Sequence, residues 1–201
     1  MLVSDVMTAP AVTVAWNTPI KAAARLLRDR DVAAAPVVDD TGGLVGIVSE
    51  IDLLRGSVLP DPVAHLLPVT SDPGGPPLSV ADVMTRDVQV LLPHSDLYDA
   101  ARSMRASGIR SLPVVAGGEV VGIVSRSDLL NVLARGDDEI VRDLHAALAA
   151  ELGPASGVSA EVVDGVVTVT GGSAGDAAAA ALVATRVPGV VRVDATGAPE
   201  R

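Results

Sequence analysis

The sequence Gly122-Ile123-Val124-Ser125-Arg126-Ser127-Asp128-Leu129-Leu130 decides the fold, because most of it occurs twice in the chain. The other copy is Gly46-Ile47-Val48-Ser49-Glu50-Ile51-Asp52-Leu53-Leu54. The similarity continues upstream, with Val3–Thr8 against Val80–Thr85 and Ala35–Val38 against Leu112–Val115. The offset between the copies is 82−5 = 77 at the start, 113−36 = 77 in the middle and 122−46 = 76 at the end. A nearly constant offset indicates a tandem duplication with a single one-residue slip.

Composition and charge restrict the class of protein. The 201 residues are 49% hydrophobic, which is enough to bury real cores, and they include no cysteine, which excludes disulfides and thiolate metal sites. A net charge of −10 and an aromatic content of 1% argue against nucleic-acid binding, because such a surface repels phosphate backbones. The three histidines, His65, His94 and His145, are isolated from one another, so we expect no metal site.

The sequence also predicts a location. The first residues lack the basic segment and apolar core of a signal peptide. No apolar run approaches the roughly 20 residues that span a bilayer. We therefore expect a soluble, cytoplasmic protein.

Each copy of the repeat is predicted to contain a leading strand, a helix, a β-hairpin and a second helix. In the first copy a helix starts after Asn17–Pro19, and in the second copy Ser95 or Asp96 caps the corresponding helix, which Gly108 closes. Glycine and aspartate turns between β-branched runs predict the two hairpins. The apolar helix faces are Ile20, Ala23, Ala24 and Leu27 in the first copy and Leu97, Ala100, Ala101 and Met104 in the second; the hairpin strands are 36–38 with 44–48 and 112–115 with 120–124.

Residues 3–55 and 80–135 resemble a tandem pair of CBS domains, the Bateman module. The nucleotide motif of that family is Gly, an apolar residue, any residue, Ser or Thr, any residue, Ser or Thr, and Asp. Gly122–Asp128 matches it at every position, whereas the first copy has Ile51 where a hydroxyl is expected. The resemblance implies an α+β protein, with an α/β CBS pair of two pseudo-symmetric βαββα repeats packed against each other.

The resemblance also implies a ligand, an adenine nucleotide (AMP, ADP or ATP) or S-adenosylmethionine, in a composite pocket. A carboxylate just inside a helix can accept hydrogen bonds from both ribose hydroxyls, which makes Asp128 the expected ribose ligand. Ser125, Ser127 and Arg110 are expected near the phosphate. The expected nucleotide-binding residues are Asp128, Ser127, Ser125, Ile123 and Arg110 from the second repeat, with Val32, Ala33, Thr8 and Val12 from the first.

A second, weaker pocket follows from the pseudo-symmetry. It would use Asp52, Ser49, Thr85, Val88 and Ile109, with Ala33 in the place of Arg110. Since it lacks both the cation and the second hydroxyl, we expect it to be empty or to hold a less phosphorylated ligand.

Structural roles for the same residues remain open alternatives. Asp128 and Asp52 could serve only to complement a helix dipole, and Ser125 and Ser49 are expected to cap helices whatever else they do. Arg110 could be an ordinary solvated side chain, and Trp16 is expected to pack beside Pro19.

The C-terminal residues follow a different pattern. Ile140, Leu144, Ala147 and Leu148 line one helix face, and an Asp164-Gly165 turn joins two alternating strands, 158–163 and 166–170. A second helix over about 176–186 and a strand at Val190–Val193 complete an αββαβ order. Together with Asp164–Gly171 and Val187–Val193, this order resembles a BON domain, a family linked to phospholipid contact. The segment shows no basic cluster, so an interaction or oligomerisation module is favoured.

These patterns predict four regions: CBS repeat 1 (1–56), a Pro- and Gly-rich linker (57–79) with a possible helical turn at Val63–Leu67, CBS repeat 2 (80–136) and a BON-like domain (137–201). We expect a non-enzymatic regulatory sensor that relays nucleotide occupancy to the BON-like domain and forms a homodimer through its CBS pair. The alternative is a structural or membrane-associating adaptor whose CBS pair is an empty dimerisation scaffold. Partners of the C-terminal domain would be protein or, less favoured, phospholipid.

Overall fold

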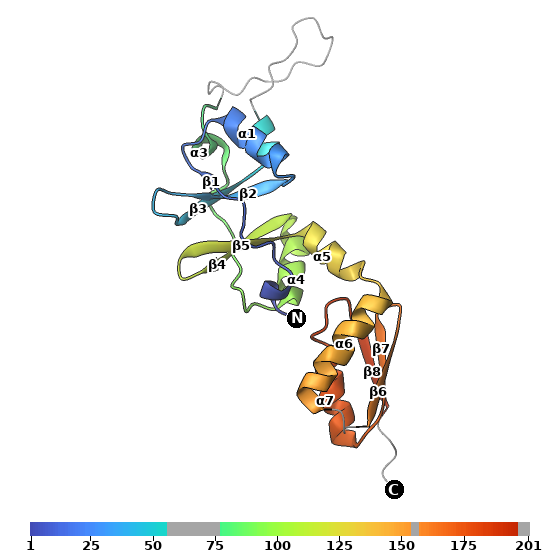
Figure 1. Ribbon diagram of the computed structural model, residues 1–201. Helices are drawn as coiled ribbons and strands as arrows, with labels where there is room; N and C mark the ends of the chain where they lie inside the picture. Colours follow the sequence, from blue (N-terminus) through green and yellow to red (C-terminus); the bar gives the residue numbers. More distant parts are fainter. Residues whose placement is uncertain (56–76, 154–156, 197–201) are drawn as a thin grey trace, which may run out of the picture. The chain divides into compact units, whose positions relative to one another are not determined.

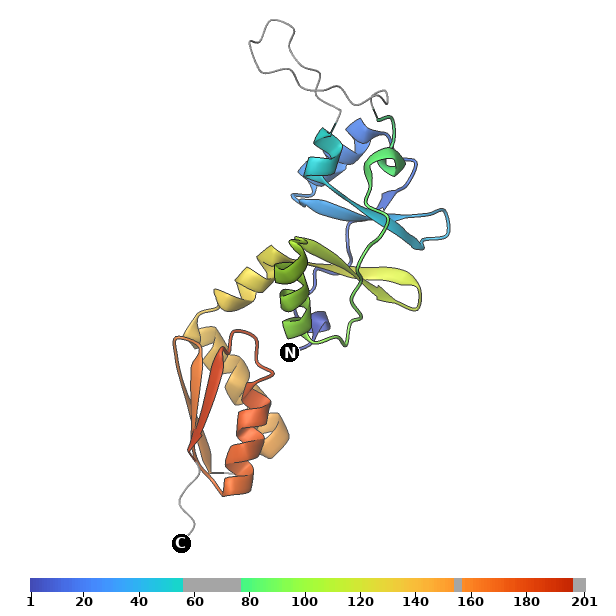
Figure 2. The same ribbon diagram turned by 180° about the vertical axis from the view of Figure 1, so that it is seen from behind.

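The computed structural model of the chain describes residues 1–55, 77–153 and 157–196 (Figures 1 and 2). These fall into two compact units, each formed by separate stretches of the chain. The hairpin unit comprises Met7–Pro93 and Ile109–Val124, and the C-terminal unit comprises Met1–Val6, His94–Gly108 and Ser125–Arg201. The α+β class predicted from the sequence is confirmed.

The hairpin unit contains the first repeat from Met7 onward. Its helix α1 begins directly after Pro19, and Ile20, Ala23 and Leu27 are buried as predicted. Ala24 is exposed, so its predicted place on the buried face is wrong. The other three residues form the buried face of the helix, and Ala24 lies beside them in a groove between α1 and α2. The elements are β1 (Val14–Ala15), α1 (Ile20–Asp29), β2 (Ala34–Val38), β3 (Leu44–Ser49) and α2 (Glu50–Leu54), with sheet order β1-β2-β3.

The hairpin of the second repeat lies in the same unit. Strands β4 (Ser111–Ala116) and β5 (Glu119–Ser125) pair as the sequence predicts. The leading strand of this repeat is reduced to one parallel bridge between Leu91 and Val114. That bridge lies 77 residues beyond the Val14–Val37 pair of β1 and β2, so the pairing follows the duplication.

The segments that lead into the repeats are exchanged between them. Thr85, which follows helix α3 (Val80–Val83) of the second repeat, pairs with Ile47 of β3, and both N–H···O bonds are 2.9 Å. Thr8 of the first repeat pairs with Ile123 of β5 through bonds of 2.9 and 3.1 Å. Each leading segment therefore extends the hairpin of the other repeat.

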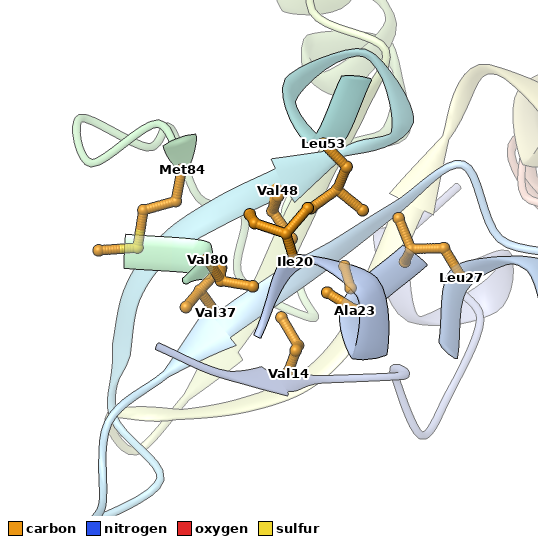
Figure 3. Close-up of a cluster of buried hydrophobic side chains, with 10 residues drawn as sticks. Val14, Ile20, Ala23, Leu27, Val37, Val48, Leu53, Val80 and Met84 are labelled. Carbon is orange, nitrogen blue, oxygen red and sulfur yellow. The ribbon is translucent and has the colours of Figure 1, made fainter. Parts of the chain in front are cut away.

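The exchange also completes the core of the first repeat. Val80, fully buried, and Met84, 9% exposed, belong to the same apolar cluster as the first repeat's own strands and helices. Figure 3 shows Val80 beside Val37, with Met84 at the edge of the cluster. The remaining buried members are Val14, Ile20, Ala23, Leu27, Ala35, Val37, Val48 and Leu53.

The motif glycines permit this close approach. A Cβ atom on Gly46 would lie 2.8 Å from the Met84 sulfur and 2.9 Å from the Thr85 carbonyl oxygen. A Cβ on Gly122 would lie 2.7 Å from the Met7 sulfur. The first residue of each nucleotide motif is thus required by packing.

The C-terminal unit begins with a similar contact between distant segments. The N–H of Val3 donates to Ser95 at 2.9 Å, and the N–H of Leu97 donates to Met1 at 3.1 Å. Helix α4 (Leu97–Ser107) is capped by Asp96 and closed by Gly108 at φ +74°, as predicted, and α5 covers Arg126–Leu133.

The last part of this unit has the predicted αββαβ order. Its elements are α6 (Asp137–Leu152), β6 (Val158–Val163), β7 (Val166–Gly171), α7 (Ala174–Ala184) and β8 (Arg192–Thr196). The sheet order is β6-β7-β8, and α6 and α7 lie on one face of it (Figure 1). The predicted start of the last strand at Val190 is wrong, because β8 begins at Arg192; the N–H groups of Val190 and Val191 donate instead to the carbonyl oxygens of Val187 and Gly165.

Most of the predicted linker lies outside the described residues. This applies to 57–76, and with it to the possible helical turn at Val63–Leu67 and to His65.

Replacing Gly46 by alanine tests the packing of the exchanged segment. The added Cβ displaces Met84 and the backbone at Thr85, so we expect a loss of about 1–3 kcal/mol in the free energy of unfolding. Urea unfolding followed by the fluorescence of Trp16, the only tryptophan, measures it. A Glu119→Ala control, an exposed site on β5, should stay within about 0.5 kcal/mol of wild type. Equal stability of the two variants would refute the packing role.

The cap of α3 predicts a pH dependence. Backbone N–H donors of Ser79 and Leu78 lower the pKa of Asp82 below its ordinary 3.8. A carboxyl whose folded pKa is depressed adds stability above its unfolded pKa and loses it as the pH falls through the folded value. The stability advantage of wild type over Asp82→Asn should therefore be present well above pH 3.8 and shrink below it. Urea midpoints on both sides of that pH test this, with Asp87→Asn as an exposed control outside the capping boxes.

Candidate functional site

The motif of the second repeat ends a strand and starts a helix. Ser125 is the last residue of β5 and the N-cap of α5. Its backbone N–H and its hydroxyl both donate to Asp128 Oδ2 at 2.7 Å, and the Asp128 N–H lies 3.4 Å from the Ser125 hydroxyl oxygen. Asp128 is half-buried and Ser127 is exposed. The predicted capping role of Ser125 is confirmed.

The first repeat repeats this geometry. The Ser49 N–H and hydroxyl donate to Asp52 Oδ2 at 2.9 and 2.6 Å, at the start of the five-residue helix α2. Ile51, which replaces the second hydroxyl of the motif, is 70% exposed. Both motif aspartates therefore have a structural role in a capping box, and in each box the two bonds use the same carboxylate oxygen.

Three backbone contacts place further predicted residues. Thr8 is bridged to Ile123, and Thr85 to Ile47, two residues before Ser49. The Ala33 carbonyl accepts from the N–H of Glu50, the first residue of α2, at 3.0 Å. Ala33 therefore lies at the start of the helix that carries Asp52. In the second predicted pocket it is expected there, as the counterpart of Arg110.

The other predicted residues differ in exposure. Arg110 is exposed and forms no hydrogen bond or ion pair with the rest of the described chain. Val12, Val32, Val88 and Ile109 are half-buried. Ser125, Ser127 and Asp128 belong to the C-terminal unit, whereas Thr8, Val12, Val32, Ala33, Arg110 and Ile123 belong to the hairpin unit.

Arg126 is a motif residue whose role the sequence did not reveal. Its guanidinium donates to the carbonyl oxygens of Gly108 at 2.8 Å and Met104 at 3.3 Å, at the C-terminal end of α4. A cation is favourable there because the helix dipole places negative potential at that end. The variable position of the motif therefore ties the start of α5 to the end of α4.

A groove between α1 and α2 was also not predicted. It has a volume of about 530 Å³ and is lined by both apolar and charged side chains. Its lining residues are Ile20, Lys21, Ala24, Leu27, Arg28, Glu50, Leu53 and Leu54.

The described residues show neither a metal-binding group nor a membrane-spanning helix. Within residues 1–55, 77–153 and 157–196, no three His, Cys, Asp or Glu side chains form a group that could hold a metal ion. None of the helices in these same ranges is long and apolar enough to cross a membrane.

The solved structures similar to this chain include ligand complexes. The CBS domain pair of protein MJ0100, crystallised with 5′-methylthioadenosine and S-adenosyl-L-methionine, is 27% identical, covers 66% of this chain and 94% of that one, and superposes with a TM-score of 0.54. CBSX2 in complex with AMP is 30% identical, covers 65% of this chain and 93% of that one, and has a TM-score of 0.52.

Sequence relatives place the chain in a family. Protein MJ1426 of Methanocaldococcus jannaschii is 36% identical over 154 residues, which cover 66% of this chain and 91% of that protein. Two further proteins of the same archaeon match over only 42% and 32% of their own length. The model of the CBS domain family matches residues 3–58 and 80–135, at both copies of the repeat. The chain belongs to the CBS domain family, of which it carries a tandem pair.

Proposed function

We propose that this chain is a cytoplasmic, non-catalytic regulatory protein that binds an adenine nucleotide or a related adenosyl compound at the second-repeat motif. The observation that carries the proposal is that the second repeat presents the exposed Ser127 and Arg110 where the first repeat has Ile51 and Ala33, although both repeats share the same capping box. Similar CBS pairs crystallised with AMP, S-adenosyl-L-methionine and 5′-methylthioadenosine support the class of ligand.

Asp128 is the proposed ribose ligand. A carboxylate has about four lone-pair positions on its two oxygens, and Ser125 donates both of its bonds to the same oxygen, Oδ2. Hydrogen bonds from vicinal ribose hydroxyls to an ionised carboxylate are worth about 1.5–3 kcal/mol each. The capping box also holds the carboxylate in place before the ligand arrives, which lowers the entropic cost of binding.

Phosphate is assigned to the same helix start. The first N–H groups of an α-helix point away from its body and favour an anion, and the exposed Ser127 hydroxyl adds a donor. Arg110 is an exposed cation whose planar fork suits phosphate oxygens, and its side chain is not engaged by other described residues. Ile123, Val12, Val32, Ala33 and Thr8 are proposed to surround the base and sugar.

The first-repeat motif is proposed as the weaker site. Asp52 and Ser49 keep the capping geometry, with Thr85 nearby and with Val88 and Ile109 from the second repeat. Ile51 and Ala33 supply neither a hydroxyl nor a cation. A ligand without phosphate, or no ligand, fits this chemistry better than a nucleotide.

The proposed protein is a homodimer with a separate module that receives the signal. Leu54 and Leu130, which occupy equivalent positions of the repeats, are 56% and 63% exposed, and apolar side chains repeated in this way favour a homodimer through the CBS pair. The segment with αββαβ order is proposed to be a BON-like interaction module that receives the occupancy signal.

Isothermal titration with ATP, ADP, AMP and S-adenosylmethionine tests the ligand class. We expect one of them to bind, and Asp128→Ala to weaken that binding by about tenfold or more, since a charge-assisted bond is lost. Asp52→Ala is the matched control, because it removes the same capping box in the other repeat and should change the affinity by less than about twofold. If none of the four binds the folded protein, the pair is an empty scaffold and the adaptor function replaces the sensor.

Arg110→Ala separates phosphate from the rest of the ligand. We expect the affinity for AMP or ATP to fall by about tenfold, while that for 5′-methylthioadenosine, which has no phosphate, changes by less than about twofold. Arg105→Ala, another exposed arginine before the hairpin, should leave both affinities unchanged. An equal loss for both ligands would show that Arg110 does not act on the phosphate.

A further inference from the structure

Arg135 lies in the connection between α5, the helix that carries the motif, and the C-terminal domain, which comprises α6 to β8. Helix α5 ends at Leu133 and α6 begins at Asp137, after the N-cap Gly136. The Arg135 side chain is only 21% exposed, which is unusual for an arginine in a short connection. It turns toward the C-terminal domain and is the residue at which the matched CBS sequence ends.

Three bonds hold the Arg135 guanidinium on that domain. Nη1 donates to the carbonyl oxygen of Pro188 at 2.7 Å, Nη2 to Asp143 Oδ2 at 2.5 Å and Nε to Glu139 Oε2 at 3.4 Å. Asp143 and Glu139 lie on α6, whereas Pro188 lies between α7 and β8. The side chain thus joins two elements that are distant in sequence, and both Asp143 and Pro188 border a hollow of about 250 Å³ in the domain.

The turn that Arg135 holds is packed tightly on its surroundings. A Cβ on Gly189 would lie 2.8 Å from Ile140 Cδ1 and 3.2 Å from Arg135 Cβ, and Gly189 has a φ of +96°. A Cβ on Gly165 would lie 2.9 Å from the Gly189 carbonyl oxygen. The N–H of Val191 donates to Gly165 at 2.9 Å. Little free space remains for this turn to move independently of Arg135.

The residue on the other side of Gly136 fixes the neighbouring turn. The two carboxylate oxygens of Asp137 accept from the N–H groups of Asp164 and Gly165 at 2.8 and 2.9 Å. Arg135 and Asp137 therefore clamp the β6–β7 turn and the turn before β8 to the start of α6. These bonds connect the residues that follow α5 to this end of the sheet.

We propose that Arg135 is the positioning residue that couples the state of α5 to the C-terminal domain. The N-terminal end of α5 carries Ser125 and Asp128, and its eight residues end two positions before Arg135. The proposal rests on the proposed function for its ligand, but the coupling itself can be measured without one, because Asp128→Ala changes the same end of α5.

Hydrogen–deuterium exchange of the full chain at Val190 and Val191 tests the coupling. Asp128→Ala should accelerate exchange at these amides by about fivefold or more in the wild-type background, which is the lower range of allosteric coupling. In the Arg135→Met background the same substitution should change the rate by less than about twofold. Arg142→Met is the matched control, since Arg142 donates to Asp138 of its own helix and should leave the response intact.

Each outcome decides the proposal. If Arg135→Met changes only the basal exchange rate, Arg135 has a structural role. If Arg135→Met abolishes the response to Asp128→Ala, Arg135 couples α5 to the C-terminal domain. Asp143→Asn, which weakens one of the three bonds, should give an intermediate response and serves if Arg135→Met does not fold. An equal response in wild type and Arg135→Met, or no response in wild type, overturns the proposal. A parallel titration with whichever of ATP, ADP, AMP and S-adenosylmethionine binds should slow exchange in wild type only. If none of the four binds, the proposed function fails, while the Asp128→Ala comparison still decides the coupling.

Discussion

The exchange of leading segments between the two repeats is the constraint on which the CBS pair depends. A single repeat of this kind is one small unit that cannot bury its hydrophobic face alone, so it needs its neighbour to complete the core. Val80 and Met84 supply the missing part of the first repeat's core, and the Thr85–Ile47 bridge holds them there. The corresponding Thr8–Ile123 bridge joins the leading segment of the first repeat to the hairpin of the second. Removing either repeat would therefore remove a paired segment from the hairpin of the other.

Features with a local cause could be predicted from the sequence. The Asp164-Gly165 hairpin and the Gly108 helix end were predicted because backbone conformation at a turn or cap is set by the residues in it. Contacts between distant residues had no such pattern. Arg126 finds its carbonyl partner 18 residues away and Arg135 finds one 53 residues away, and in the sequence both resemble ordinary surface arginines. The residue pattern did not reveal the exchange of segments for the same reason, although the family resemblance places Thr8 with the second motif and Thr85 with the first.

Comparison of the two copies separates the motif residues that folding requires from the others. The glycine admits the methionine of the exchanged segment, and the serine and aspartate cap the following helix. All three are present in both copies, although only the second matches the nucleotide motif throughout. These pairs are Gly46 and Gly122, Ser49 and Ser125, and Asp52 and Asp128. Their presence is explained by packing and capping, so by itself it does not argue for a ligand.

Two positions that differ between the copies support ligand binding by the second copy. Ser127 and Arg110 are both exposed, and their counterparts Ile51 and Ala33 occur in a repeat with the same hairpin and the same capping box. Folding therefore does not require a hydroxyl or a cation at these two positions. A hydroxyl and a guanidinium are instead the groups that would recognise phosphate beside a helix start. Because the first copy lacks both groups and retains the structural residues, the proposed preference for a phosphorylated ligand is assigned to the second copy alone.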